Sequence, residues 1–171
     1  MKIAIDIGHN CHPDIGAVGI KAEDELVKLI GTRLGVKLIR AGYSVIFCTP
    51  SSCSSVADSL RQRVAIANTG NADLYVSLHF NAFNGEAHGS EVFAISPQGK
   101  KAAASVLKEI VELGYRDRGV KDGSKFFVLK HTRMPAILIE CCFVDAKTDM
   151  KLLDVDKMVD AILRGLMAPL K

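Results

Sequence analysis

The sequence lacks the features that mark several functional classes. It contains no run of five or six like charges, and its net charge is only +3, so a dedicated nucleic-acid binder is not expected. No stretch is long and uncharged enough to span a bilayer, so membrane insertion is not expected either. Internal repeats, low-complexity segments and domain boundaries are also missing.

The five cysteines do not form a familiar motif. Cys11, Cys48 and Cys53 stand apart, Cys141 and Cys142 are adjacent, and no C-x-x-C pair occurs. An odd count without such a pair indicates reduced thiols and not a disulfide framework. We interpret the vicinal pair as buried core residues and not as a nucleophile, because nothing in the pattern lowers a thiol pKa.

The first ten residues, MKIAIDIGHN, lack the long apolar region and the cleavage site of a secretory signal. We therefore expect the protein to be cytoplasmic as synthesised. With 171 residues, 49% of them apolar, the chain can bury the core of one domain without disulfides. We expect a single domain over residues 1–171.

Short β-branched runs alternate with longer amphipathic segments along the whole chain. This rhythm predicts an α/β fold whose largely parallel sheet is covered by helices on both faces, while the adjacent late strands allow an antiparallel member. The predicted strands are 2–7, 43–48, 73–79, 90–95, 125–130 and 136–140, and the predicted helices are 23–41, 56–68, 99–114 and 155–167.

Polar side chains follow three of these strands. The first strand leads into His9, the third ends at His79, and the run AILIE ends at Glu140. Ligands of an open parallel sheet bind beyond the carboxyl ends of its strands. A histidine in such a place is usually only a hydrogen-bonded side chain, but a carboxylate after four apolar residues is costly to bury without a partner. Together, the three groups favour a functional site.

A fourth polar group comes from the acidic start of the first predicted helix. On a helical wheel of about 100° per residue, Leu26 and Ile30 lie on the buried stripe with Glu23, while Asp24 and Glu25 turn away. These two acids have an ordinary role, since they complement the helix dipole. Glu23 instead needs a partner inside the protein.

Two imidazoles and one carboxylate form a ligand set that suits Zn²⁺ and leaves one coordination position open for water. His9, Glu23 and His79 provide this set. Glu140 then remains as a general base for that water. The pattern predicts metal-assisted hydrolysis of an amide or an ester.

The residues around these four positions resemble a known family. The "GH" after the first strand, "AEDEL", "RVAIANTGNADLYVSLHFNA", "GSEVF" and "MPAILIECCFVD" are similar, in order and spacing, to the zinc-dependent N-acetylmuramoyl-L-alanine amidases of the amidase-3 type. The resemblance covers essentially the whole chain. Its most specific parts are "SLHFNA" and "ILIE" followed by Phe143.

The resemblance implies cleavage of the amide that joins the lactyl group of N-acetylmuramic acid to L-alanine in peptidoglycan. Because we see no secretory signal, we expect the protein to act on the cell wall after release or non-classical export. It implies zinc ligation by His9, Glu23 and His79, catalysis by Glu140, and a twisted, mostly parallel sheet of about six strands. We expect a monomer. Two rivals keep the same fold, namely a zinc peptidase that cuts within the stem peptide and a non-catalytic wall-binding module.

Two departures from the family pattern affect the expected site. The family opening G-H-G-G reads "GHNC" here, and Asn10 tolerates a positive φ better than Cys11 does. Some relatives carry a helical insertion that plugs the zinc cleft, whereas only "FNGEAHG" follows the strand of His79. We expect no built-in plug.

Other polar residues have weaker claims. Asn81, His88 and His131 are candidates for substrate binding, and His12 is a poor candidate for a ligand. Asp6 either orients a metal-bound histidine or forms a salt bridge to a neighbouring strand. Arg61 and Arg63 are expected to be solvated or structural.

Overall fold

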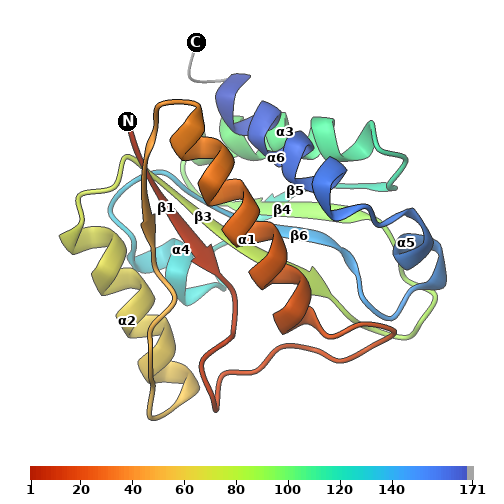
Figure 1. The fold of residues 1–171 in the computed structure, drawn as a ribbon, viewed down its shortest axis with the longest axis horizontal. Coiled ribbons are helices and arrows are strands. Elements are labelled where there is room, and N and C mark those ends of the chain that lie inside the picture. Colours follow the sequence, from red (N-terminus) through yellow and green to blue (C-terminus); the bar gives the residue numbers. More distant parts are fainter. Residues whose placement is uncertain (169–171) are drawn as a thin grey trace.

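The computed structural model describes residues 1–168 as six strands and six helices around one sheet (Figure 1). The strands are β1 (Lys2–Ile7), β2 (Ser44–Phe47), β3 (Leu74–Asn81), β4 (Ser90–Ala94), β5 (Asp117–Asp122) and β6 (Ala136–Phe143). The helices are α1 (Glu23–Arg40), α2 (Val56–Thr69), α3 (Pro97–Val111), α4 (Phe127–His131), α5 (Lys147–Leu152) and α6 (Val155–Met167).

The sheet has the strand order β2-β1-β3-β6-β4-β5. All neighbouring strands are parallel except β4 and β6, which are antiparallel. The prediction of a mostly parallel α/β sheet with six strands and helices on both faces is therefore confirmed. The strands β4 and β5 are parallel to each other and run antiparallel to the other four. The carboxyl ends of β1, β3 and β6 lie next to one another in the middle of the sheet.

The two faces of the sheet are covered unequally. The larger hydrophobic core lies between one face and the helices α1, α3 and α6, and it includes Ile3, Val76 and Ile139. The smaller core lies between the other face and the helices α2 and α4, and it includes Tyr75 and Leu138. In Figure 1 the helices α1 and α6 cross the sheet on the viewer's side.

One predicted strand is wrong. Residues 125–130 do not form a strand, because the short helix α4 begins at Phe127 and buries Val128 and Leu129 against the sheet. A short apolar run fits a strand or a buried helical turn equally well, and its periodicity does not separate the two. The sixth strand is β5, whose sequence DRGVKD has no apolar alternation because it is an edge strand paired only with β4.

The described residues include no helix that is long and apolar enough to cross a membrane. The segment between β3 and β4, residues 82–89, contains only turns and bends. The connection that follows His79 therefore has no helix that could cover the neighbouring strand ends.

Helix α1 offers a matched test of the larger core. Ile30 is completely buried against the sheet, whereas Ile39 on the same helix is 56% exposed. We expect Ile30→Ala to lower the free energy of unfolding by about 2–5 kcal/mol because it leaves a cavity, and Ile39→Ala to change it by only about 0.5 kcal/mol. Urea denaturation measures both. Equal losses would show that α1 does not pack as described.

Candidate active site

The candidate site lies where β1, β3 and β6 end. His79 on β3 and Glu140 on β6 are direct partners in the parallel register. The polar side chains of these strands follow a period of two, so Ser77, His79 and Glu140 belong to the face that α2 and α4 cover. The sheet therefore presents an imidazole and a carboxylate side by side at its carboxyl edge.

The loop after β1 brings His9 to the same edge. His9 and Asn10 both have left-handed backbone conformations, with φ of 55° and 58°. The Asn10 side-chain amide donates hydrogen bonds to the carbonyl oxygens of Gly8 and Asp24, at 3.0 and 3.1 Å, and so ties the loop to α1. Gly8 has to be a glycine, because a Cβ there would lie 2.5 Å from Cε1 of His79.

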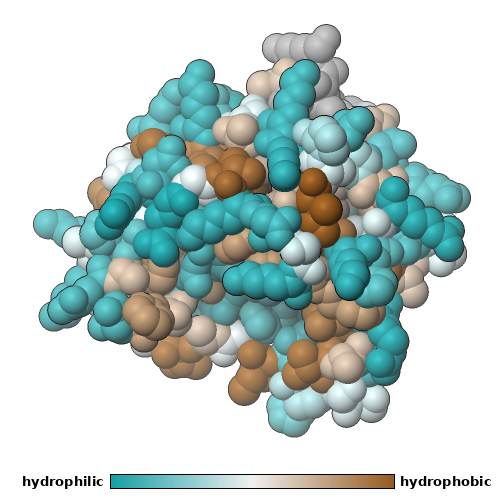
Figure 2. All heavy atoms as spheres, turned by 180° about the vertical axis from the view of Figure 1, so that it is seen from behind, coloured by the Kyte–Doolittle hydropathy of each residue, from teal (hydrophilic) through white to brown (hydrophobic). Residues whose placement is uncertain are grey.

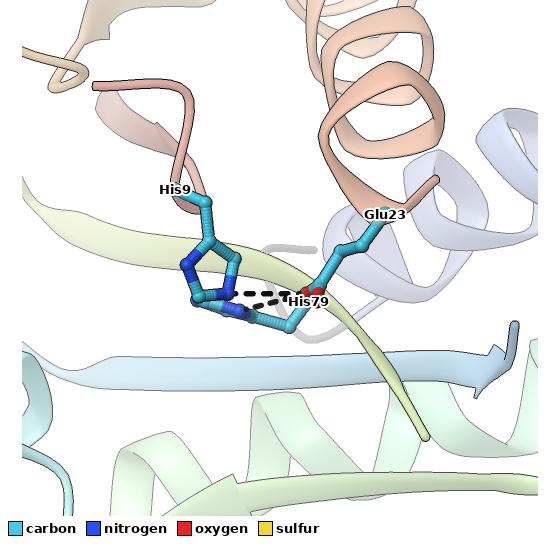
Figure 3. A group of neighbouring side chains, drawn as sticks. All are labelled: His9, Glu23 and His79. Atoms are coloured by element: carbon cyan, nitrogen blue, oxygen red, sulfur yellow. Dashed lines mark hydrogen bonds and ion pairs between the residues drawn. The ribbon is translucent and has the colours of Figure 1, made fainter. Parts of the chain in front are cut away.

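His9, Glu23 and His79 come together from three separate elements (Figure 3). Oε1 of Glu23 lies 3.4 Å from Nε2 of His9 and 3.2 Å from Nδ1 of His79. One ligand atom from each residue lies within 4.8 Å of the others. Two nitrogens and a carboxylate oxygen in this arrangement form a group that is able to hold a metal ion.

The carboxylate of Glu23 is fixed before any ligand binds. Its side chain is only 3% exposed, and it accepts hydrogen bonds from the backbone N–H groups of Ala17 and Phe80, both at 2.9 Å. Burial alone would raise the pKa of Glu23, but hydrogen bonds with His79 and His9 lower it well below its ordinary value. Glu23 is therefore an anion at neutral pH.

Asp14 orients the ring of His9, and sequence reasoning missed it. Its Oδ1 lies 2.8 Å from Nδ1 of His9, which leaves Nε2 facing Glu23. Burial disfavours the charged imidazole, but the hydrogen bonds that the imidazole donates to Asp14 and Glu23 outweigh burial and raise the pKa of His9 to about 10. No local pattern distinguishes Asp14 from an ordinary acid in a loop.

Arg63 of α2 connects this loop to the sheet. The guanidinium is 1% exposed and pairs with Asp6 at 2.6 Å. It also donates hydrogen bonds to the backbone carbonyls of Ile7 and His9 and lies 3.4 Å from Oδ2 of Asp14. Arg63 is therefore structural and not solvated, whereas Arg61 is exposed.

Asp6 forms a salt bridge, but its partner Arg63 is on helix α2 and not on a neighbouring strand as expected. Its carboxylate also accepts hydrogen bonds from the hydroxyl groups of Tyr75 and Ser77, both at 2.7 Å. Within the described part of the chain Asp6 has no direct hydrogen bond to a histidine, and Arg63 connects it to the backbone carbonyl of His9.

Glu140 has an unsatisfied carboxylate oxygen. Its Oε2 is buried and has no hydrogen-bond partner among residues 1–168. The pKa of Glu140 is raised to about 7, mainly because the carboxyl group is buried. The nearby negative charges of Glu23 and Glu91 raise this pKa further. A carboxyl group poised near neutrality beside a possible ion site is typical of a general base.

A pocket of about 420 Å³ connects these groups. One wall carries His9, Glu23, His79 and Glu140. The opposite wall is mostly apolar and consists of Val56, Leu60, Phe126, Phe127 and Val128 from α2 and from the start of α4, together with Lys125. The smaller layer of helices thus leaves a cleft directly over the strand ends.

The remaining candidates lie around or outside this pocket. The Asn81 amide donates a hydrogen bond to Glu91 at 2.9 Å. His88 lies in the loop before β4, with Nδ1 2.9 Å from its neighbour's backbone carbonyl. His131 stacks on Phe127 and faces a separate hollow. His12 is exposed. The structure therefore does not bring these residues to the His9–Glu23–His79 group.

Sequence reasoning also missed the ion cluster around Glu91. This residue is the register partner of Glu140 on β4. Its carboxylate binds Arg118 at 2.8 Å and also Lys121. Both cations come from the edge strand β5, which the sequence pattern did not predict, so the cluster could not be anticipated.

All five cysteines are free thiols. Cys141 and Cys142 are completely buried, as predicted. Burial is the main cause that raises the pKa of each of these two thiols above its ordinary value. Neither thiol is therefore suited to act as a nucleophile.

The chain belongs to the N-acetylmuramoyl-L-alanine amidase family, because the model of that family matches residues 3–170. The chain is 33% identical over 174 residues to the N-acetylmuramoyl-L-alanine amidase LytC of Bacillus subtilis, covering 95% of this chain and 34% of LytC. It is 32% identical over 172 residues to the endolysin of Bacillus phage SPP1, covering 94% of this chain and 61% of the endolysin.

The fold is also that of solved amidase domains. The catalytic domain of the CD27L endolysin, which targets Clostridia difficile, superposes with a TM-score of 0.89 at 25% identity and covers 98% of this chain and 97% of that domain. The chain spans less than half the length of several curated relatives, for example 46% of a Clostridium perfringens protein that is 34% identical. It thus corresponds to one part of those longer proteins.

The contact between Asp14 and His9 generates a prediction. We expect Asp14→Ala to weaken the binding of a divalent metal ion by about 10–100-fold, because the His9 ring loses the partner that fixes its orientation. Chelator competition measures the affinity, and circular dichroism checks the fold. Asp160→Ala, which removes a surface carboxylate paired with Lys37, is the matched control and should bind the metal ion normally. Unchanged affinity in the Asp14 variant would contradict the assignment.

Proposed function

We propose that residues 1–171 form a single catalytic domain that hydrolyses the amide between the lactyl group of N-acetylmuramic acid and L-alanine in peptidoglycan. The observation that carries the proposal is the convergence of His9, Glu23 and His79 beside Glu140. Membership of the amidase family supports the same reaction. The protein would act on the cell wall, as an endolysin or an autolysin does.

The donor set fits zinc. Two nitrogens and one oxygen leave a fourth tetrahedral position for water, as in catalytic zinc sites. When bound by His9, Glu23 and His79, Zn²⁺ would polarise the scissile carbonyl and lower the pKa of water towards neutrality. The unsatisfied buried oxygen of Glu140 next to this group is the partner that such water needs.

The chain's own residues then have defined tasks. Glu140 accepts a proton from the water that attacks the carbonyl carbon. It then returns this proton to the nitrogen of L-alanine as the amide bond breaks, so that a free lactyl carboxylate and a free amine result. Asp14 keeps Nε2 of His9 directed at Glu23. The absence of a helix between β3 and β4 supports activity without an activating partner.

Product analysis tests the reaction. We expect the zinc-loaded protein to digest isolated cell walls without an added activator, releasing intact stem peptides and leaving free lactyl groups on the glycan. Mass spectrometry of the digest separates the alternatives. Shortened stems would indicate a stem peptidase, and binding without any product would indicate a wall-binding module.

Two variants separate the metal ligands from the base. We expect Glu140→Ala to retain one zinc ion per chain and to lose at least about 100-fold in rate, as is typical when a general base is removed. His79→Ala should lose the zinc itself. Metal analysis and wall-digestion assays measure both effects, with Glu109→Ala on the distant surface of α3 as the matched control. Equal zinc loss in the first two variants would make Glu140 a ligand.

A further inference from the structure

The apolar wall of the pocket points to the part of the substrate that enters it. Five side chains line this wall without contributing a hydrogen-bonding group, namely Val56, Leu60, Phe126, Phe127 and Val128, and Leu138 of β6 adds an apolar side chain from the sheet. A sugar ring needs many hydrogen-bond partners, and the polar side chains at the base of the pocket, Asp6 and Arg63, already bind each other. Small alkyl groups suit the pocket better.

One cation on this wall is available to a ligand. Lys125 lines the pocket and forms no salt bridge with any residue from 1 to 168, whereas Lys121 and Arg118 are both paired with Glu91. The Lys125 ammonium lies 5.1 Å from the ring centroid of Phe93 and 4.9 Å from that of Phe126. These cation–π contacts favour a position of the ammonium over the two rings.

The strand position beneath Lys125 lies two residues from the position of Glu140. Phe93, which lies under the ammonium, is the register partner of Leu138, and Glu91 is the partner of Glu140. The two positions are thus separated by two residues of a strand, about 7 Å. An extended dipeptide spans about the same distance.

We propose that this wall is a subsite for the first two residues of the stem peptide, and that Lys125 binds the free α-carboxylate of the γ-linked D-glutamate at the second position. The inference rests on the proposed amidase function. The alanine methyl group and the glutamate methylenes then contact the apolar side chains, and the glycan stays outside the pocket.

Figure 2 shows the face opposite α1 and α6, where hydrophobic side chains form separate small groups among hydrophilic ones.

Two substrates that differ in one group test this subsite. They are N-acetylmuramoyl tripeptides whose second residue carries either the free α-carboxylate or the α-carboxamide. We expect the zinc-loaded protein to cleave the carboxylate form with a kcat/KM about tenfold higher, because a charge-assisted hydrogen bond is lost in the amide. In Lys125→Met the two values should become equal, and in Lys125→Arg the preference should persist.

Lys130→Met is the matched control, since Lys130 is an exposed lysine near the end of α4 that lines a different hollow. It should keep the preference of the unmodified protein. Equal cleavage of both substrates by the unmodified protein, or an unchanged preference in Lys125→Met, would overturn the subsite. Failure of the zinc-loaded protein to cleave either substrate would instead overturn the proposed function.

Discussion

The buried guanidinium of Arg63 is the interaction on which the candidate site depends. It joins helix α2 to Asp6 in the sheet, to Asp14, and to the backbone carbonyl of His9. Two consecutive residues of this loop have positive φ, which costs about 1–3 kcal/mol each. Breaking a buried ion pair costs about 3–5 kcal/mol. The network is therefore strong enough to hold the loop in a conformation that the backbone alone would not choose.

The same network explains why the site tolerates several carboxylates in a small volume. Asp6 and Asp14 share the charge of Arg63, so neither acts as an unpaired anion. Glu23 is stabilised by two backbone N–H groups and two imidazoles. Of these four carboxylates, Glu140 is the one with a buried oxygen that has no partner among residues 1–168, and its pKa is raised whereas that of Glu23 is lowered. The surroundings of these two glutamates at one sheet edge thus shift their pKa values in opposite directions.

The central part of the site could be predicted from the sequence because it follows from periodicity. The strands around His9, His79 and Glu140 are strongly apolar, and the stripe of α1 selects Glu23 among three neighbouring acids. The structure brings all four residues to one pocket. Their roles as ligands and base remain predictions, since proximity alone does not assign them.

The missed features share a physical cause. Arg63 and Glu91 act through partners far away in the sequence. Asp14 is only five residues from His9, but it contacts that ring across an irregular loop whose path no local spacing encodes. The edge strand β5 was not predicted because its sequence is polar and lacks apolar alternation. The segment around α4 was misread because its apolar residues satisfy either a strand or a helical turn.

The unequal covering of the sheet explains why the site forms on one face only. Along β1, β3 and β6 one set of alternating residues is uniformly apolar and packs under α1, α3 and α6. The other set changes from apolar to polar towards the carboxyl ends, with Asp6, Ser77, His79 and Glu140. Because α4 has only five residues, it covers the apolar part of this face and ends the layer there. The polar part is left open to the pocket, which residues of α2 and of α4 border on the other side.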